Sequence, residues 1–218
     1  MLTLIAIAIF LIIIGSTWWF GLWNNLLTLI NLLLAGLVAS SFYENMAITL
    51  EAWAPSFIYF SDFLAVWLIF VLVFAVLRTA TDLLSSMRLR FDPVTEMMGR
   101  SVLSIWIAVV FIAFSFFTLH MAPIPPDFYG DLAAKPARRM IGVGPDRFWL
   151  AFIQSRSRGA LAESRTAPLL PAYDAADSHP EDAELDARVF DPKARFIDDF
   201  HANRQKLSQQ STLRTASN

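Results

Sequence analysis

The sequence predicts an all-α integral membrane protein with four transmembrane helices, a short interfacial segment and a largely disordered polar C-terminal tail. Two observations predict this class. The 218 residues are 56% hydrophobic and only 17% charged, whereas soluble domains contain about 45–50% apolar and about 25% charged residues. The charges are also uneven, because residues 1–43 have none and residues 1–120 carry only four of the 17 basic side chains. We therefore expect a membrane block, residues 1–122, followed by a polar tail, residues 123–218.

Several classes of protein are excluded by composition. The chain has no cysteine, so it has no disulfide framework, no cysteine-based zinc site and no iron–sulfur centre. Its net charge of −2 lacks the basic surplus of a nucleic-acid-binding protein. We expect no cofactor, no metal site and no nucleic-acid partner.

The uncharged residues 1–43 are long enough for two spans, because one crossing needs about 20 apolar residues. We place the spans at about 2–19 and 23–42. The break between them carries the aromatic side chains that concentrate at membrane–water boundaries: Trp18, Trp19, Phe20 and Trp23. The start of the chain has no basic residue and no small-residue cleavage site, which favours a retained span over a signal peptide.

Residues 43–62 mix three acids with large apolar side chains, and Pro55 interrupts any long helix there. This pattern is typical of an amphipathic or re-entrant segment at the membrane interface. An ordinary loop with exposed apolar residues is the alternative, and the sequence leaves both open.

The third and fourth spans are predicted at about 62–84 and 101–121, joined by a loop. Arg78 and Asp82 lie four residues apart in the last turns of the third span, close enough to form an ion pair at the interface. Three prolines soon after residue 121 end the fourth span.

Basic residues in short loops predict the orientation in the membrane. All four basic residues of the block lie between residues 78 and 100, whereas residues 43–62 carry only acids. This places loop 85–100 in the cytoplasm and both termini on the outer, periplasmic side of a bacterial inner membrane. Three basic residues that follow the last span argue for the opposite orientation: Lys135, Arg138 and Arg139.

Two spans carry a face of small and polar residues at helical spacing. The faces are Asn24, Thr28, Asn31, Ala35 and Ala39 in the second span, and Ser101, Ser104, Ala108, Ser115 and Thr118 in the fourth. Small residues let helices approach closely, and amides and hydroxyls bond between helices. The faces therefore predict packing, within the chain or in a homo-oligomer. The alternative is a narrow passive channel with a hydroxyl and amide wall.

Signals for catalysis are weak. The three histidines lack paired metal-ligand spacing, and Gly142 and Gly144 form only a turn signal. The membrane block also has no ionisable residue firmly at mid-membrane, which counts against coupled transport. We expect that the protein is not an enzyme.

The tail carries nine of the eleven prolines and blocks of like charge, which are typical of disordered segments. Two helices are predicted within it, near 145–158 and 194–208. The first places Phe148, Trp149 and Phe152 on one side, as candidates for docking into a partner's groove. A surface helix that rests on the bilayer or on the membrane block is the alternative.

Four segments of the membrane block carry a resemblance to a known family. They are Gly21-Leu-Trp-Asn-Asn25, Ala39-Ser-Ser-Phe-Tyr-Glu44, Arg78-Thr-Ala-Thr-Asp82 and Gly99-Arg100. With four short spans, residues 1–122 resemble the bacterial colicin V production protein (CvpA) family. The resemblance implies an inner-membrane accessory protein linked to toxin production or export, or to envelope upkeep. Membrane lipid, further copies of the chain or other membrane proteins would be its partners, and no catalytic residue is implied.

Overall fold

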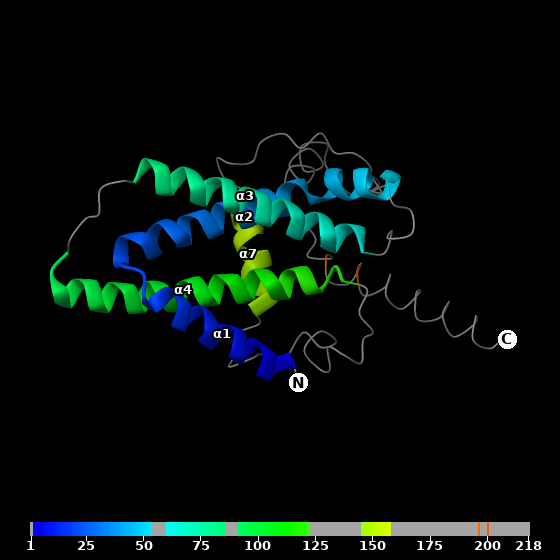
Figure 1. Ribbon diagram of the computed structural model, residues 1–218. Coiled ribbons are helices and arrows are strands. Elements are labelled where there is room, and N and C mark those ends of the chain that lie inside the picture. Colours follow the sequence, from blue (N-terminus) through cyan, green and yellow to red (C-terminus); the bar gives the residue numbers. More distant parts are fainter. Residues whose placement is uncertain are drawn as a thin grey trace, which may run out of the picture. The chain divides into compact units, whose positions relative to one another are not determined.

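The computed structural model describes residues 2–53, 60–85, 91–122 and 145–157, together with Phe196 and Phe200, and these stretches are helical (Figure 1). The helices are α1 (Leu2–Trp18), α2 (Leu22–Trp53), α3 (Ser61–Leu84), α4 (Pro93–Leu119) and α7 (Pro145–Ser157). The chain divides into two compact units, Met1–Arg147 and Phe148–Asn218. The all-helical prediction is confirmed for the described stretches.

Three of the helices, α2, α3 and α4, are long and apolar enough to cross a membrane. This confirms the prediction of membrane-type helices. Helix α1 is equally apolar but shorter, at 17 residues.

Helix α2 is longer than the predicted second span. It continues without a break to Trp53, so residues 43–53 are its last turns and not a separate interfacial segment. The physical reason is a line of buried side chains at a spacing of four residues, in which Ala39 is followed by Tyr43 and Ala47. Burial of this line continues the helix past the charged residues. Pro55 lies outside the described residues.

Helix α4 begins at Pro93, eight residues before the predicted start of the fourth span. The side chain of Asp92 accepts a hydrogen bond from the backbone N–H of Val94 at 3.3 Å. An acidic N-cap followed by proline at the first helical position is a favourable helix start. Part of the predicted loop is therefore helix, while residues 86–90 lie outside the described part.

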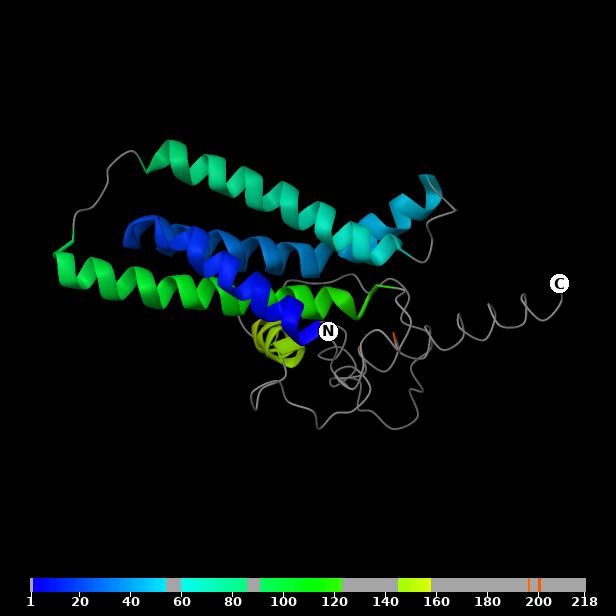
Figure 2. The same cartoon turned by 60° about the horizontal axis from the view of Figure 1, so that its bottom comes forward.

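The first part of α2 lies between α3 and α4 in both views of the first unit, and α2 then crosses α3 (Figures 1 and 2). Helix α1 packs along α4. In the closest pair, α2 and α3, both helices carry small side chains that are fully buried, among them Ala35, Ala39 and Ala65. Small side chains let helix backbones come close.

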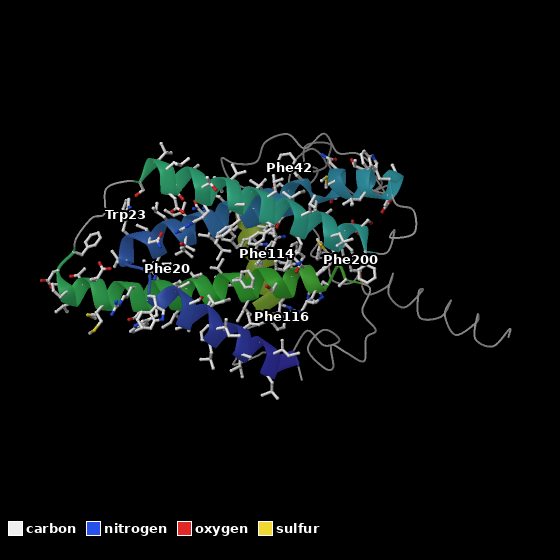
Figure 3. All side chains as sticks on the ribbon, in the orientation of Figure 1. Phe20, Trp23, Phe42, Phe114, Phe116 and Phe200 are labelled. Atoms are coloured by element: carbon white, nitrogen blue, oxygen red, sulfur yellow. The ribbon has the colours of Figure 1, made fainter. Side chains whose placement is uncertain are left out.

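The backbones of α3 and α4 come close at few points, and large rings fill the space between them. We call Trp67, Phe70, Phe74, Phe111, Phe114 and Phe117 the aromatic cluster. Phe70 and Phe114 stack with ring centroids 4.6 Å apart, and Trp67 meets Phe114 edge-on at 5.7 Å. Figure 3 shows Phe114 inside the bundle and Phe42 on its outside.

In the tail, α7 coincides with the helix predicted near 145–158. Of the helix predicted near 194–208, only Phe196 and Phe200 are described, both helical, with ring centroids 4.9 Å apart. The segments for which the sequence predicts disorder lie outside the described residues.

Candidate functional site

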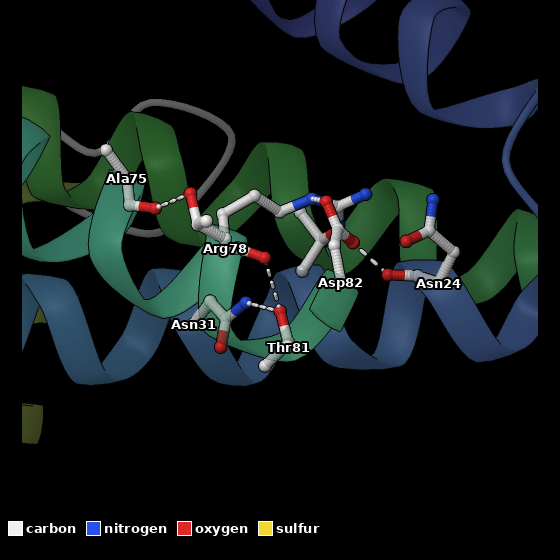
Figure 4. A network of polar contacts seen from close by, with 8 residues as sticks. Asn24, Asn31, Ala75, Arg78, Thr81 and Asp82 are labelled. Carbon is white, nitrogen blue, oxygen red and sulfur yellow. Dashed lines mark hydrogen bonds and ion pairs between the residues drawn. The ribbon is translucent and has the colours of Figure 1, made fainter. Parts of the chain in front are cut away.

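Polar side chains join α2 to α3 over several turns (Figure 4). A terminal guanidinium nitrogen of Arg78 donates to Thr28 Oγ1 at 2.9 Å, and Arg78 Nε lies 3.1 Å from Asp82 Oδ2. The Thr28 hydroxyl donates in turn to the backbone carbonyl of Asn24 at 2.8 Å. The arginine thus bridges two helices while its charge is matched by the carboxylate one turn further along α3.

One turn deeper, Asn31 makes the second link of this interface. Its side-chain amide donates to Thr81 Oγ1 at 2.9 Å, and the Thr81 hydroxyl donates to the backbone carbonyl of Arg78 at 2.9 Å. Asn31 is buried, as are Ala35 and Ala39 beyond it on the same face of α2. Two residues of the predicted polar face of the second span, Thr28 and Asn31, therefore bond to α3. The side chain of the third polar member, Asn24, makes no hydrogen bond within the described residues.

Asn25 joins three helices from a fully buried position. Its side-chain amide donates to the backbone carbonyl of Thr17 at 3.1 Å and to Ser104 Oγ at 3.2 Å, with a longer contact of 3.5 Å to the carbonyl of Arg100. It therefore ties the end of α1 and the start of α4 to α2. Its Oδ1 is buried without a hydrogen-bond partner.

Sequence reasoning did not include Asn25 in either polar face, although it lies next to Asn24. The available signal was its position near the start of an apolar span, because a buried amide in lipid needs a partner on a neighbouring helix. The spacing rule selected Asn24, Thr28 and Asn31 and passed over it. Trp67 and Thr81, the α3 partners, were likewise not singled out.

Two further hydrogen bonds hold the same end of the bundle. Glu96 Oε1 accepts from the backbone N–H of Leu22 at 2.7 Å, which satisfies an otherwise unpaired donor at the start of α2. Trp23 Nε1 donates to Ser85 Oγ at 2.7 Å. We call this group the polar end: Thr17, Trp18, Leu22, Trp23, Asn25, Ser85, Glu96, Arg100 and Ser104.

Arg100 lies at this end against α1. Its guanidinium carbon is 5.2 Å from the centroid of the Trp18 ring, within the range of a cation–π contact. Gly99 beside it allows the close approach of α2, because a Cβ at this position would collide with the side chain of Leu22. Arg100 and Gly99 both belong to the segments that carry the family resemblance.

The predicted polar face of the fourth span does not act as one surface. The hydroxyls of Ser101 and Ser115 donate to carbonyls of their own helix, at 2.6 and 2.8 Å. Ser104 accepts from Asn25, and Thr118 Oγ1 accepts from Trp67 Nε1 at 3.1 Å. The members that reach other helices therefore end on different partners, α2 for one and α3 for the other.

The predicted docking residues of α7 differ in exposure. Trp149 is buried with 1% exposure, whereas Phe148 is 40% exposed. The rings of Trp149 and Phe152 lie 5.5 Å apart. The three side chains do not form a single exposed apolar face.

Within the described stretches, no group of three or more metal-ligating side chains is placed to hold an ion. No protein family model, no curated protein and no solved structure matches the chain. The geometry therefore describes a helix bundle held by interhelical polar bonds.

Proposed function

We propose that the chain is a non-enzymatic accessory protein of the bacterial inner membrane, which assembles with other membrane proteins or with further copies of itself. One observation carries the assembly part. The polar groups of α2 bond to neighbouring helices of the same chain, while the outward face of α3 is apolar. The exposed residues of α3 include Leu64, Leu68, Val71, Leu72, Val76 and Leu83, and its exposed polar residues, Thr79 and Asp82, lie near its C-terminal end.

Lipid tails are as apolar as these side chains, so burial alone does not drive a partner onto them. Close packing between helices and the release of lipid can drive this association, and the aliphatic face of α3 is available for both. The pathway part of the proposal, toxin (colicin V) production or export or envelope upkeep, rests on the resemblance of residues 1–122 to the colicin V production protein family.

The proposal includes α1 as a fourth span. A helix of 17 residues is about 26 Å long, slightly less than the hydrocarbon thickness of about 30 Å. Its side chains Leu4, Ile5, Leu11 and Ile12 are exposed, as lipid contact requires. With Arg78 and Arg100 near the polar end, the positive-inside rule places that end in the cytoplasm.

Because the natural chain has no cysteine, single-cysteine labelling tests this topology directly. Val94→Cys reports on the polar end and Trp53→Cys on the opposite end of α2; both positions are exposed. We expect a membrane-impermeant maleimide to label intact cells at residue 53 and at an Asn218→Cys variant. Residue 94 should react only after permeabilisation. A Leu2→Cys variant reports on the span of α1 and should also be labelled in intact cells. Labelling of residues 2 and 53 on different sides, or of residues 53 and 218 on different sides, would contradict four spans.

Photo-cross-linking in cells tests the assembly. A photoreactive amino acid at Leu72, on the exposed face of α3, should yield adducts with another membrane protein or a second copy. The matched control is Ala65, which is fully buried on the same helix and should give none. Adducts with lipid alone at Leu72, and no adducts at Phe148, would contradict an assembly role.

The pathway needs a separate measurement. In a bacterium that lacks its own colicin V production protein, we expect the full chain to restore secretion of the toxin. An unrelated four-span anchor fused to residues 123–218 is the control and should fail. Equal rescue by that control would show that residues 1–122 act only as a membrane anchor.

A passive channel predicts a different result from the same bundle. The bonds from Asn31 to Thr81 and from Arg78 to Thr28 favour packing of these groups over an open path. We expect liposomes containing the purified chain to show no ion flux, with or without Asn31→Leu. Flux that changes in the variant while assembly is retained would support the channel and contradict the proposal.

A further inference from the structure

We propose that Arg100 and Trp18, at the polar end, form a binding site for the headgroup phosphate of an anionic phospholipid. This goes beyond the assembly role and takes from the proposed function only the orientation in which the polar end lies at the cytoplasmic membrane surface. Failure of lipid binding would therefore leave the assembly role untouched.

The positive charge of Arg100 is only partly compensated within the bundle. Its guanidinium lies over the Trp18 ring, and its Nε is buried without a hydrogen-bond partner. The rest of the side chain is partly exposed. A guanidinium has five N–H donors, and the π-face of an indole satisfies the charge only in part. Arg100 is thus a cation with no carboxylate or other protein acceptor among the described residues.

The expected carboxylate does not pair with Arg100. Glu96 precedes Arg100 by four residues on α4, the favourable arrangement for a helical ion pair. Instead, Glu96 Oε1 bonds to the backbone N–H of Leu22 at 2.7 Å, and no Glu96–Arg100 ion pair forms among the described residues. Arg78, in contrast, is paired with Asp82 at 3.1 Å. The two arginines of the described bundle therefore differ in whether their charge is matched.

The location of Arg100 supports a lipid site. Arg100 directly precedes the apolar run of α4, and the turn after α1 exposes Trp19 and Phe20 beside Trp18. Aromatic side chains of this kind mark the headgroup level of a bilayer. Phosphate binds an arginine through two parallel N–H bonds, and the cytoplasmic leaflet is rich in anionic lipids.

An apolar stripe on α1 favours a lipid over a soluble anion. Leu4, Leu11 and Trp18 are spaced by seven residues, so they lie on one face of α1, and all three are exposed. A phosphate held at Arg100 would place its acyl chains beside this stripe. A free anion gains nothing from the stripe, whereas a phospholipid binds both parts.

Native mass spectrometry of the full chain in detergent tests the site. We expect phosphatidylglycerol to bind more tightly than phosphatidylcholine, and Arg100→Gln to weaken phosphatidylglycerol binding about fivefold, as expected for one arginine near an anionic surface. Arg78→Gln removes the same charge from a paired arginine and should leave this affinity unchanged. An equal loss in both variants, or none in Arg100→Gln, would overturn the proposal.

A second pair of variants keeps Arg100 in place. Met97→Glu offers it a carboxylate three residues away, whereas Met98→Glu adds the same charge at an unsuitable spacing; both positions are exposed. We expect only the first to weaken phosphatidylglycerol binding, a result that does not depend on Arg100→Gln folding. Millimolar inorganic phosphate should not displace the lipid. Displacement would show that the site binds a soluble anion and would overturn the proposal of a lipid site.

Discussion

The polar end and the aromatic cluster hold the same four-helix unit by different means. At the polar end, α1, α2 and α4 are joined through the buried amide of Asn25, and Glu96 holds the start of α2. In the aromatic cluster, α3 and α4 are joined by stacked and edge-on rings, with one indole bond from Trp67 to Thr118.

This difference follows the separation of the backbones. Where helices lie close, as α2 does to α3, small residues and short polar side chains reach across. Where they lie further apart, as α3 and α4 do, only large rings span the gap. In a bilayer the hydrophobic effect does not choose between these solutions, because the outside is apolar too. Shape and hydrogen bonding make the choice.

The largest effect is expected from Phe114→Ala, which would remove the centre of the aromatic cluster. Phe114 is 1% exposed and stacks on Phe70, so the variant leaves a cavity between α3 and α4. We expect a loss of about 3 kcal/mol in the free energy of unfolding, at the low end for such changes because lipid replaces part of the transfer term. Unfolding in mixed micelles measures it. The control Phe42→Ala, at an exposed position, should be nearly neutral, and equal losses would contradict a packed cluster.

Next in size is Asn25→Leu at the polar end. It removes the bonds to Thr17 and Ser104, which should cost about 1–2 kcal/mol. The matched control is Asn24→Leu, because the Asn24 side chain makes no hydrogen bond within the described residues. The same unfolding assay compares the two. If the neighbouring substitution were the more damaging, Asn25 would not be the junction of three helices.

A smaller effect is expected from Gly99→Val, which tests how closely α2 and α4 approach. The added side chain would collide with Leu22, but that side chain can partly rotate away, so we expect a loss of about 1 kcal/mol. Gly15→Val is the control, since nothing lies within 4 Å of a Cβ there. Retained stability in both variants would mean that α2 does not press on α4 at this point.

The smallest effect is expected from Thr81→Val, which removes the acceptor of the Asn31 amide. Interhelical bonds in membranes are worth about 0.6 kcal/mol on average, and we expect a loss of that size. Thr79→Val is the control, because its hydroxyl donates only to Ala75 of its own helix. Equal thermal stability of the two variants in detergent would show that the Asn31–Thr81 bond adds nothing.

Much of the helical layout was predictable, and the departures have local causes. The third span was placed within one residue of α3, because an uninterrupted apolar run has clear limits. The second and fourth were misjudged where charges enter a helix. Of the acids near the end of α2, Glu44 is exposed and Glu51 accepts a hydrogen bond from Ser61 of α3, while Tyr43 and Ala47 stay buried. A count of charges along the sequence detects the acids, but it does not detect the buried side chains that continue the helix.

The polar faces of the second and fourth spans were also predictable only in part. Helical spacing identified Asn31 and Ser104 as residues that face a neighbour, yet it indicated neither neighbour. Asn31 bonds to α3, and Ser104 bonds to Asn25, a residue that the spacing rule omitted. Spacing reports the face of a single helix, and the partner depends on which helix lies opposite.

The sequence by itself determined that this protein is helical and suited to a membrane, because hydropathy and charge act residue by residue along the chain. A local cap at Asp92 and Pro93 also starts α4, although the sequence analysis predicted a loop there. Only the tertiary structure decided that the first part of α2 lies between α3 and α4, that Asn25 joins three helices, and that Glu96 binds the start of α2 and leaves Arg100 unpaired. Those outcomes depend on distances between segments far apart in the chain, which no local pattern contains.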